Sequence, residues 1–123
     1  MQTQNQCLQL LMKDGILIGT YEKDLNIDLD IARQIVEYRL AFTKGKTVPA
    51  MIFSSGIKSI DKPARDYLAS EKGTAGLSAT AIIARSPFSR IMGNFFLKVN
   101  ETGIPVKIFS DAVRAEKWLK QFV

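Results

Sequence analysis

The sequence contains no histidine and a single cysteine, Cys7. Without histidine the commonest general base is missing, together with the Ser/His and Cys/His nucleophile pairs and most zinc sites. A single thiol cannot form an internal disulfide bond. Paired acids are scarce, and the closely spaced Asp24, Asp28 and Asp30 are explained by the start of a helix. We therefore expect a protein that is not an enzyme, with no catalytic residues, no metal site and no cofactor.

Long apolar runs are also missing. None approaches the roughly 18–20 residues that span a membrane. The polar residues 1–6, which we expect to be flexible, lack the charged and apolar parts of a signal peptide. These absences predict a cytoplasmic protein that does not span a membrane.

The composition is that of one globular domain covering residues 1–123, with 46% apolar and 24% charged residues. The net charge is +5, from 17 basic and 12 acidic residues. Because the basic residues are spread along the chain without a run, they favour a solubilising surface over a nucleic-acid groove. Nucleic acid is therefore not an expected partner.

The N-terminal third predicts a hairpin followed by a helix. Two apolar, β-prone runs flank Asp14-Gly15, a dipeptide that favours the positive φ angles of a type I′ turn. From Asp28 to about Thr43 apolar residues recur at helical spacing, with Asp28 as the expected cap. On this helix the pattern assigns Arg33 and Arg39 to the solvent face.

The remaining sequence alternates between short apolar runs and amphipathic segments. Strands are expected at residues 48–53, 77–84 and 106–109, and Pro49 indicates that the first of these begins at or near a sheet edge. Helices are expected after the caps Asp61, Ser86, and Ser110 or Asp111. The order ββαβαβαβα predicts an α/β fold in which an N-terminal hairpin joins a mostly parallel sheet through right-handed crossovers.

Two stretches of the C-terminal part carry a family resemblance. Residues 81–96, with the strand Ala81–Ala84 and the serine-started helix, form the first, and residues 105–111 continuing to Trp118-Leu119 form the second. Together with the element order they resemble the STAS-like fold of anti-sigma-factor antagonists and the related SEC14-like proteins, above all small uncharacterised bacterial members. The resemblance implies a STAS-like domain over the whole chain.

The same resemblance bears on regulation. Antagonists of this class carry a phosphorylatable serine where the third strand leads into the next helix, in an Asp-Ser-Ser-Gly-like motif. Residues 55–57 resemble the small loop before this point, and Asp61 resembles the aspartate of the motif. Lys62 and Pro63 follow it, so the resemblance implies that the acceptor serine is missing and the phospho-switch is lost. Phosphorylation at Ser54 or Ser55, which lie too early for the motif, is the alternative.

The start of the helix predicted from residue 86 is the candidate binding site. Backbone N–H groups are unpaired in the first helical turn, and the helix dipole is positive there. Ser86 and Ser89 lie in this turn, Arg85 and Arg90 add positive charge, and Asn94 follows one turn beyond Arg90. Such a cluster could hold a phosphate, a carboxylate or an acidic residue of a partner. The alternative is an ordinary Ser-Pro cap with solvated arginines.

The same helix offers a candidate interface. Gly93 lies in mid-helix, where it costs roughly 0.5–1 kcal/mol relative to alanine, a cost that close approach of another backbone would justify. Leu97 falls on the same side, away from the main apolar stripe. The two residues favour a partner-binding or homodimer face, with packing inside the domain as the alternative.

These observations leave two main hypotheses for function, besides an enzyme that would need a buried cluster of lysine, tyrosine or carboxylate side chains with perturbed pKa values. The first is a non-enzymatic regulatory or protein-interaction module of STAS-like type, without the usual phosphoacceptor serine, which binds a protein partner or forms a homodimer. The second, suggested by the SEC14-like relatives, is a binder of a small anionic or amphipathic, lipid-like ligand.

Overall fold

The computed structural model describes residues 7–85 and 103–123. Its elements, in chain order, are β1 (Leu8–Lys13), β2 (Ile16–Tyr21), β3 (Leu25–Ile27), α1 (Leu29–Thr43), β4 (Val48–Phe53), β5 (Ile57–Ile60), α2 (Lys62–Ala69), β6 (Leu77–Ile83), β7 (Val106–Phe109), α4 (Ala112–Leu119) and the 3-10 turn η1 (Lys120–Phe122). The helix predicted from residue 86 lies outside the described residues. Within them, none of the helices is both long and apolar enough to cross a membrane.

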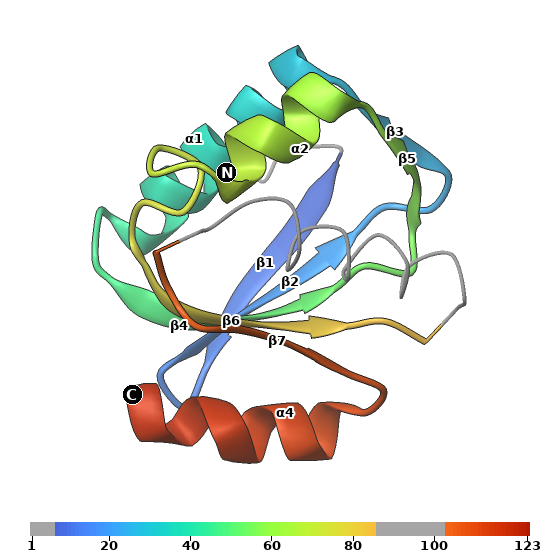
Figure 1. Ribbon diagram of the computed structural model, residues 1–123. Helices are drawn as coiled ribbons and strands as arrows, with labels where there is room; N and C mark the ends of the chain where they lie inside the picture. Colours follow the sequence, from blue (N-terminus) through green and yellow to red (C-terminus); the bar gives the residue numbers. More distant parts are fainter. Residues whose placement is uncertain (1–6, 86–102) are drawn as a thin grey trace.

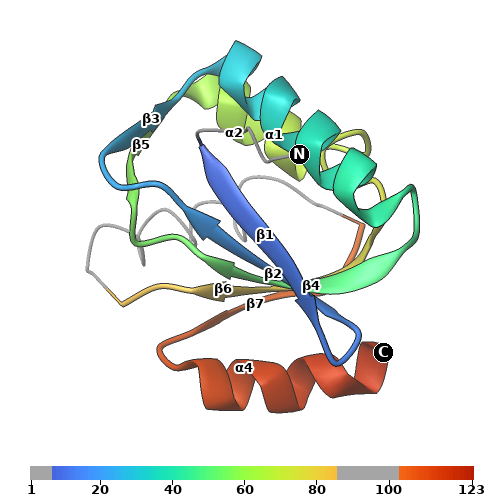
Figure 2. The same cartoon turned by 180° about the vertical axis from the view of Figure 1, so that it is seen from behind.

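The fold has three layers, with a mixed sheet in the middle and helices on both of its faces. The sheet has five strands in the order β1-β2-β4-β6-β7, and only the β1–β2 pair is antiparallel. Helices α1 and α2 cover one face of the sheet and α4 covers the other, as the two opposite views show (Figures 1 and 2). This arrangement confirms the predicted α/β class with its N-terminal hairpin and mostly parallel sheet.

A second, small sheet is a feature that the sequence did not predict. Strands β3 and β5 pair in parallel beside the starts of α1 and α2 (Figure 1). Each strand ends in a buried isoleucine, Ile27 and Ile60 respectively, that packs between the main sheet and the two helices. The small sheet therefore fixes the points from which α1 and α2 begin.

The hairpin turn has the predicted geometry. Asp14 and Gly15 both adopt positive φ angles, +53° and +83°. Lys13 and Ile16 directly flank them in the β1–β2 register. A two-residue turn of this kind matches the right-handed twist of the strands it joins, so β1 and β2 pair without a break.

The position of Pro49 shows that the predicted edge location of β4 is wrong. Strand β4 lies in the middle of the sheet, between β2 and β6. Pro49 is tolerated there because the β2–β4 pairing begins only at Ala50, and the β4–β6 register shifts between Val48 and Pro49. The missing N–H of proline thus falls at the start of the strand, where no ladder bond depends on it.

The three described helices begin at the capping residues that the sequence indicates. The side chains of Asp28, Asp61 and Asp111 accept hydrogen bonds from backbone N–H groups three residues later, at 2.9, 3.0 and 2.9 Å. For α4 this decides between the two predicted caps, Ser110 and Asp111, in favour of Asp111. Each cap satisfies one of the N–H groups left unpaired at a helix start.

Apolar side chains form a separate core on each face of the sheet. The core under α1 and α2 comprises Leu8, Ile27, Ala32, Ile35, Ile60 and Ala64. The core over α4 comprises Ile16, Met51, Ala79, Ala81, Ile83, Ala115 and Leu119. Trp118 and Phe122 pack against this second core and against each other.

Arg39 is a correction to the helical pattern of α1, because its side chain is buried rather than solvated. Only 7% of the residue is exposed. Its guanidinium Nη2 donates to the carbonyl oxygens of Gly73 and Ala75, at 3.2 and 2.6 Å. Burial lowers the pKa of Arg39, while the neighbouring Tyr21 and Tyr67 act in the opposite direction. The guanidinium thus ties α1 to the chain segment that follows α2.

Replacing Arg39 by methionine should lower the free energy of unfolding by about 1–3 kcal/mol. Methionine keeps an apolar stem but leaves two carbonyl groups without their donor, and an unpaired buried polar group is costly. Chemical denaturation of Arg39→Met and Arg33→Met provides the test. Arg33, in the same helix, makes only an exposed 3.9 Å contact with Asp30, so its replacement should change little. Equal losses in the two variants would contradict the role assigned to Arg39.

Candidate functional site

The junction between β5 and α2 is the place where the resemblance located the regulatory motif. Strand β5 ends at Ile60, whose side chain is buried, and the chain turns at Asp61 into α2. The first two helical residues, Lys62 and Pro63, are exposed. The fold therefore presents the start of α2 to solvent while anchoring the residue before it in the core.

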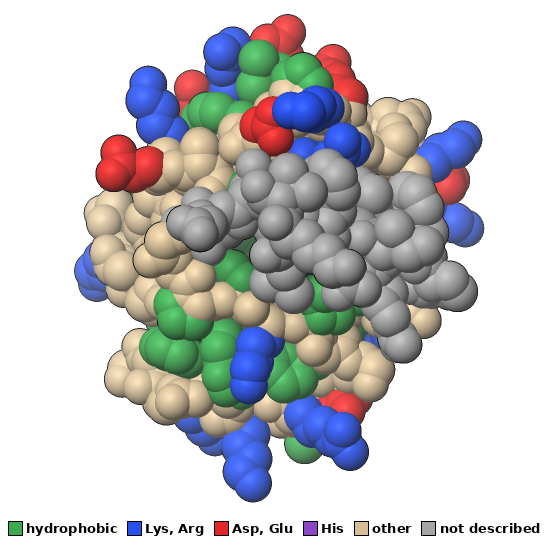
Figure 3. Space-filling model, in the orientation of Figure 1, with side chains coloured by type: hydrophobic (Ala, Val, Ile, Leu, Met, Phe, Trp, Pro, Cys, Tyr) green, Lys and Arg blue, Asp and Glu red, His purple; other side chains and the backbone are tan. Residues whose placement is uncertain are grey.

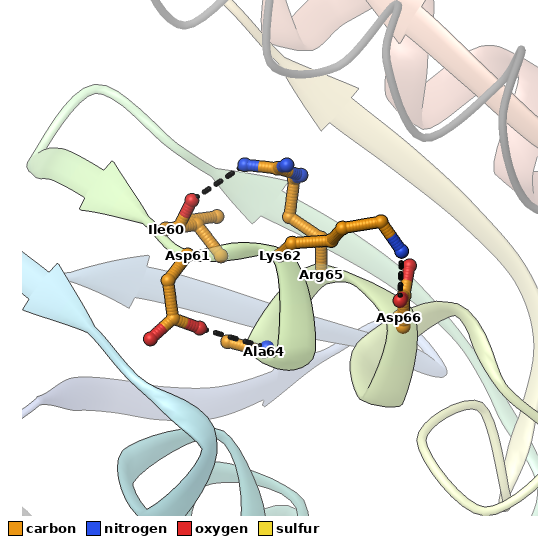
Figure 4. Close-up of polar contacts among 6 residues, drawn as sticks. All are labelled: Ile60, Asp61, Lys62, Ala64, Arg65 and Asp66. Carbon is orange, nitrogen blue, oxygen red and sulfur yellow. Dashed lines mark hydrogen bonds and ion pairs between the residues drawn. The ribbon is translucent and has the colours of Figure 1, made fainter.

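Three polar contacts fix this junction (Figure 4). The Asp61 Oδ1 accepts the N–H of Ala64 at 3.0 Å. The Arg65 Nη1 donates to the carbonyl oxygen of Ile60 at 2.7 Å, which holds the end of β5 against the helix. The Lys62 Nζ donates to the Asp66 Oδ2 at 2.8 Å along the outer side of α2.

The junction presents ionisable side chains of both signs. Its ionisable side chains are two basic ones, Lys62 and Arg65, and two acidic ones, Asp61 and Asp66. The Lys62–Asp66 pair is largely exposed, so it contributes little to stability and both groups remain accessible to another molecule. The two positions after Asp61, where the resemblance expects an acceptor hydroxyl, carry an ammonium group and a proline ring.

The serines earlier in the loop occupy two different environments. Ser54 is buried, with 7% exposed. Its Oγ donates to the carbonyl oxygen of Ile83 at 3.1 Å and its N–H reaches the same oxygen at 3.3 Å, so it joins the ends of β4 and β6. Ser55 is exposed. The hydroxyl of Ser54 therefore has a structural role.

Gly56 allows the loop to lie close to the end of β2. A Cβ atom at this position would overlap the carbonyl oxygens of Tyr21 and Glu22. The carbonyl of Gly56 in turn accepts the N–H of Leu25 at 3.0 Å, at the start of β3. The small loop of residues 55–57 therefore has a packing role that aligns β3 with β5.

Of the predicted binding cluster, only Arg85 lies within the described residues. It is exposed, directly beyond the end of β6, and its guanidinium carbon lies 5.8 Å from the centroid of the Phe53 ring. The other predicted residues, Ser86, Ser89, Arg90 and Asn94, and the predicted interface residues Gly93 and Leu97, lie outside the described residues. The proposed cluster and interface remain predictions.

A second basic side chain rests on an aromatic ring near α4. The Lys107 Nζ lies 5.5 Å from the ring centroid of Trp118, which also packs against Phe109 and Phe122 at centroid distances of 5.8 and 5.1 Å. Figure 3 shows hydrophobic side chains gathered on this part of the molecule, around β7 and α4. Lysine over tryptophan covers part of this apolar surface with its aliphatic stem.

At this site the sequence analysis missed side-chain contacts, although the residue types were visible. The spacing of Lys62 and Asp66 by four residues is a signal for an ion pair along a helix, and it was available. The bond from Arg65 to Ile60 has no comparable signal, because it depends on how α2 leaves β5.

Within the described residues there is no group of three or more acidic or cysteine side chains that could hold a metal ion.

Comparisons with known proteins support the fold. A comparison with curated proteins found no significant match. Among solved structures, an uncharacterized protein of the DUF3478 family with a SpoIIAA-like fold, from Shewanella loihica PV-4, superposes with a TM-score of 0.57 at 17% identity, covering 91% of each chain. The anti-sigma factor antagonist SpoIIAA in its unphosphorylated form gives a TM-score of 0.56 at 14% identity, covering 92% of this chain and 97% of that one.

These likenesses confirm the predicted STAS-like fold, and at such low identity they concern the fold alone. The model of one family, described as a domain of unknown function, DUF7793, matches residues 10–123. The chain has a SpoIIAA-like fold and belongs to the DUF7793 family.

Proposed function

We propose that this chain is a non-enzymatic regulatory module that acts by binding a protein partner, and that the start of α2 is its contact surface. The observation that carries the proposal is the exposed, mixed-charge turn Asp61–Asp66, held in place by bonds to Ile60 and Ala64. It occupies the place at which the resemblance puts the regulatory motif of anti-sigma-factor antagonists. A rigid turn with accessible charges of both signs suits recognition of another protein.

We further propose that this binding is independent of phosphorylation. Neither Lys62 nor Pro63 can accept a phosphoryl group as a serine does, and Lys62 is already engaged with Asp66. Ser54 is buried and hydrogen-bonded. Such a module would be controlled by the abundance of the chain or of its partner.

Site-specific photo-crosslinking tests this proposal. A photoreactive amino acid replaces Lys62 in one version of the full chain and Lys117, exposed on α4 at the opposite face of the sheet, in a matched control. In extracts of the native cells, the Lys62 version should give a discrete protein adduct that the Lys117 version does not give. The adduct identifies the partner by mass spectrometry.

Competition and intact mass complete the test. Excess unmodified protein and the Lys117→Glu variant should suppress the adduct, whereas Lys62→Glu should suppress it at least about tenfold less well, because the charge reversal opposes recognition at the turn. Protein isolated from the same cells should have its unmodified mass. Adducts that do not depend on the labelled position, equal competition by both variants, or a phosphorylated protein would each contradict the proposal.

The alternative of a small anionic or lipid-like ligand rests on the predicted cluster of residues 85–94, of which the structure describes only Arg85. The Arg85 guanidinium lies against the ring of Phe53. This alternative stays a prediction, and the described residues favour the protein-binding function.

A further inference from the structure

The two edges of the main sheet differ in how well they are protected against pairing. Strand β7 has four residues, follows Pro105 and carries the exposed Lys107 in its middle. Strand β1 has six residues in unbroken register with β2, contains no proline, and has its single charge, Lys13, at its end. Short length, proline and central lysine are the devices that keep an edge strand from pairing with another chain. Only β7 has them.

Strand β1 also exposes apolar side chains. Leu11 is 51% exposed and Met12 is 43% exposed. Figure 2 shows β1 along the edge of the sheet that faces the reader. A long, regular edge strand with exposed apolar residues is the usual template for strand addition.

On the outer side of β1, backbone groups at alternate residues have no partner among residues 7–85 and 103–123. The N–H of Glu22 donates to the carbonyl oxygen of Cys7 at 2.9 Å, so these two residues form a hydrogen-bonded pair across the hairpin. In an antiparallel ladder such pairs alternate with pairs whose N–H and C=O groups point away from each other. The residues whose backbone groups point outward are therefore Leu8, Leu10 and Met12.

These groups are complementary to those of a second, antiparallel β1. Pairing about a two-fold axis at Leu10 puts Leu10 opposite its own copy and Leu8 opposite Met12. This register forms three hydrogen-bonded pairs and about six hydrogen bonds, whereas a shift of two residues in either direction loses one pair. It also sets apolar side chains against apolar side chains, because Leu8, Leu10 and Met12 share one face of the strand.

Charge supports the same register. Lys13 falls opposite Cys7 of the second copy, and Glu22, which directly follows β2, is the hydrogen-bonded neighbour of Cys7. The Glu22 carboxylate is close enough to help burial raise the pKa of the Cys7 thiol. Lys13 of one copy and Glu22 of the other therefore lie two strands apart, roughly 10 Å, with Cys7 between them, and the two-fold axis repeats this arrangement of opposite charges.

We propose that two copies of this chain pair through antiparallel β1 strands about Leu10, which joins their five-stranded sheets into one. The interface uses none of the residues of the α2 turn, so it stands independently of the proposed contact surface. One strand from each copy makes a small interface, and we expect a concentration-dependent equilibrium between monomer and dimer.

Sedimentation equilibrium of the full chain tests the proposal. The wild-type mass should rise with concentration from 13.7 kDa toward twice that value. Met12→Pro removes an outward N–H without touching a bond to β2, and should raise the dimer dissociation constant at least about tenfold. Met12→Leu, which keeps the N–H and an apolar side chain, should behave as wild type. Circular dichroism confirms that each variant is folded.

A charge swap tests the register and does not depend on proline. Lys13→Glu and Glu22→Lys should each weaken the dimer, and the double variant should recover part of the loss, because opposite charges again lie two strands apart across the interface. A wild-type chain that stays at 13.7 kDa at every concentration would overturn the proposal. So would a dimer that Met12→Pro leaves unchanged, or a double variant no stronger than the singles.

Discussion

Replacing Leu119 by alanine is expected to lower the free energy of unfolding by about 2–5 kcal/mol. Leu119 is fully buried, and it is one of the two α4 residues in the core between this helix and the sheet. The sheet beneath it carries Ala79 and Ala81, whose short side chains let α4 approach closely. Alanine side chains have no freedom to move into a cavity, so the space left by the leucine would stay largely empty.

Urea denaturation of Leu119→Ala and Val113→Ala measures this effect within one helix. Val113 is 80% exposed, so its truncation should change the free energy of unfolding by less than about 0.5 kcal/mol. The midpoint should move in Leu119→Ala with little change in the denaturant slope, since the native surface is nearly the same. Similar losses of unfolding free energy in both variants would contradict the assigned role of Leu119 in packing α4 against the sheet.

Features with a local cause were predictable from the sequence. The turn at Asp14-Gly15 follows from the positive φ angles that these residues tolerate, and the caps Asp28, Asp61 and Asp111 follow from side chains that can reach an unpaired N–H. Each of these predictions depends on residues within a few positions of one another, and each is confirmed.

Features that depend on distant parts of the chain were not predictable. Strands β3 and β5 are too short to show alternation, and they exist because they pair with each other across about thirty residues of sequence. From the sequence, Pro49 indicates a sheet edge, because proline cannot donate a ladder hydrogen bond. In the structure its missing N–H falls at the start of a central strand, where no hydrogen bond is needed. Helical spacing assigns Arg39 to the solvent face. Its burial could not be predicted, because the carbonyl groups that accept its hydrogen bonds belong to Gly73 and Ala75, far along the chain.

The candidate site divides in the same way. The sequence placed Asp61 at a helix start, and the family resemblance implies that Lys62 and Pro63 stand where an acceptor serine is expected. It could not show that Ser54 is buried, because its partner is the carbonyl oxygen of Ile83 at the end of another strand. That contact buries Ser54 and leaves Ser55 as the exposed one of the two serines.

Ser54→Asp, the usual mimic of phosphoserine, is expected to lower the free energy of unfolding by about 3–5 kcal/mol at neutral pH. The carboxylate would lie in a buried position beside the carbonyl oxygen of Ile83, an acceptor that cannot donate to it. It would also lose the hydrogen bond that joins the ends of β4 and β6. A phosphoryl group carries more charge, so modification of Ser54 would disrupt the native fold rather than switch it.

The pH dependence separates the cost of the charge from that of the larger side chain. Burial raises the folded-state pKa of a carboxyl above its unfolded value of about 3.9, so the penalty is nearly absent below pH 4 and grows as the pH rises toward the folded-state pKa. Denaturation of Ser54→Asp across this range should therefore show its stability falling relative to wild type with increasing pH. Ser55→Asp, at the exposed neighbour, should follow the wild type throughout. A stable, pH-independent Ser54→Asp variant would show that Ser54 is accessible in the native protein and would reopen phosphorylation as its means of control.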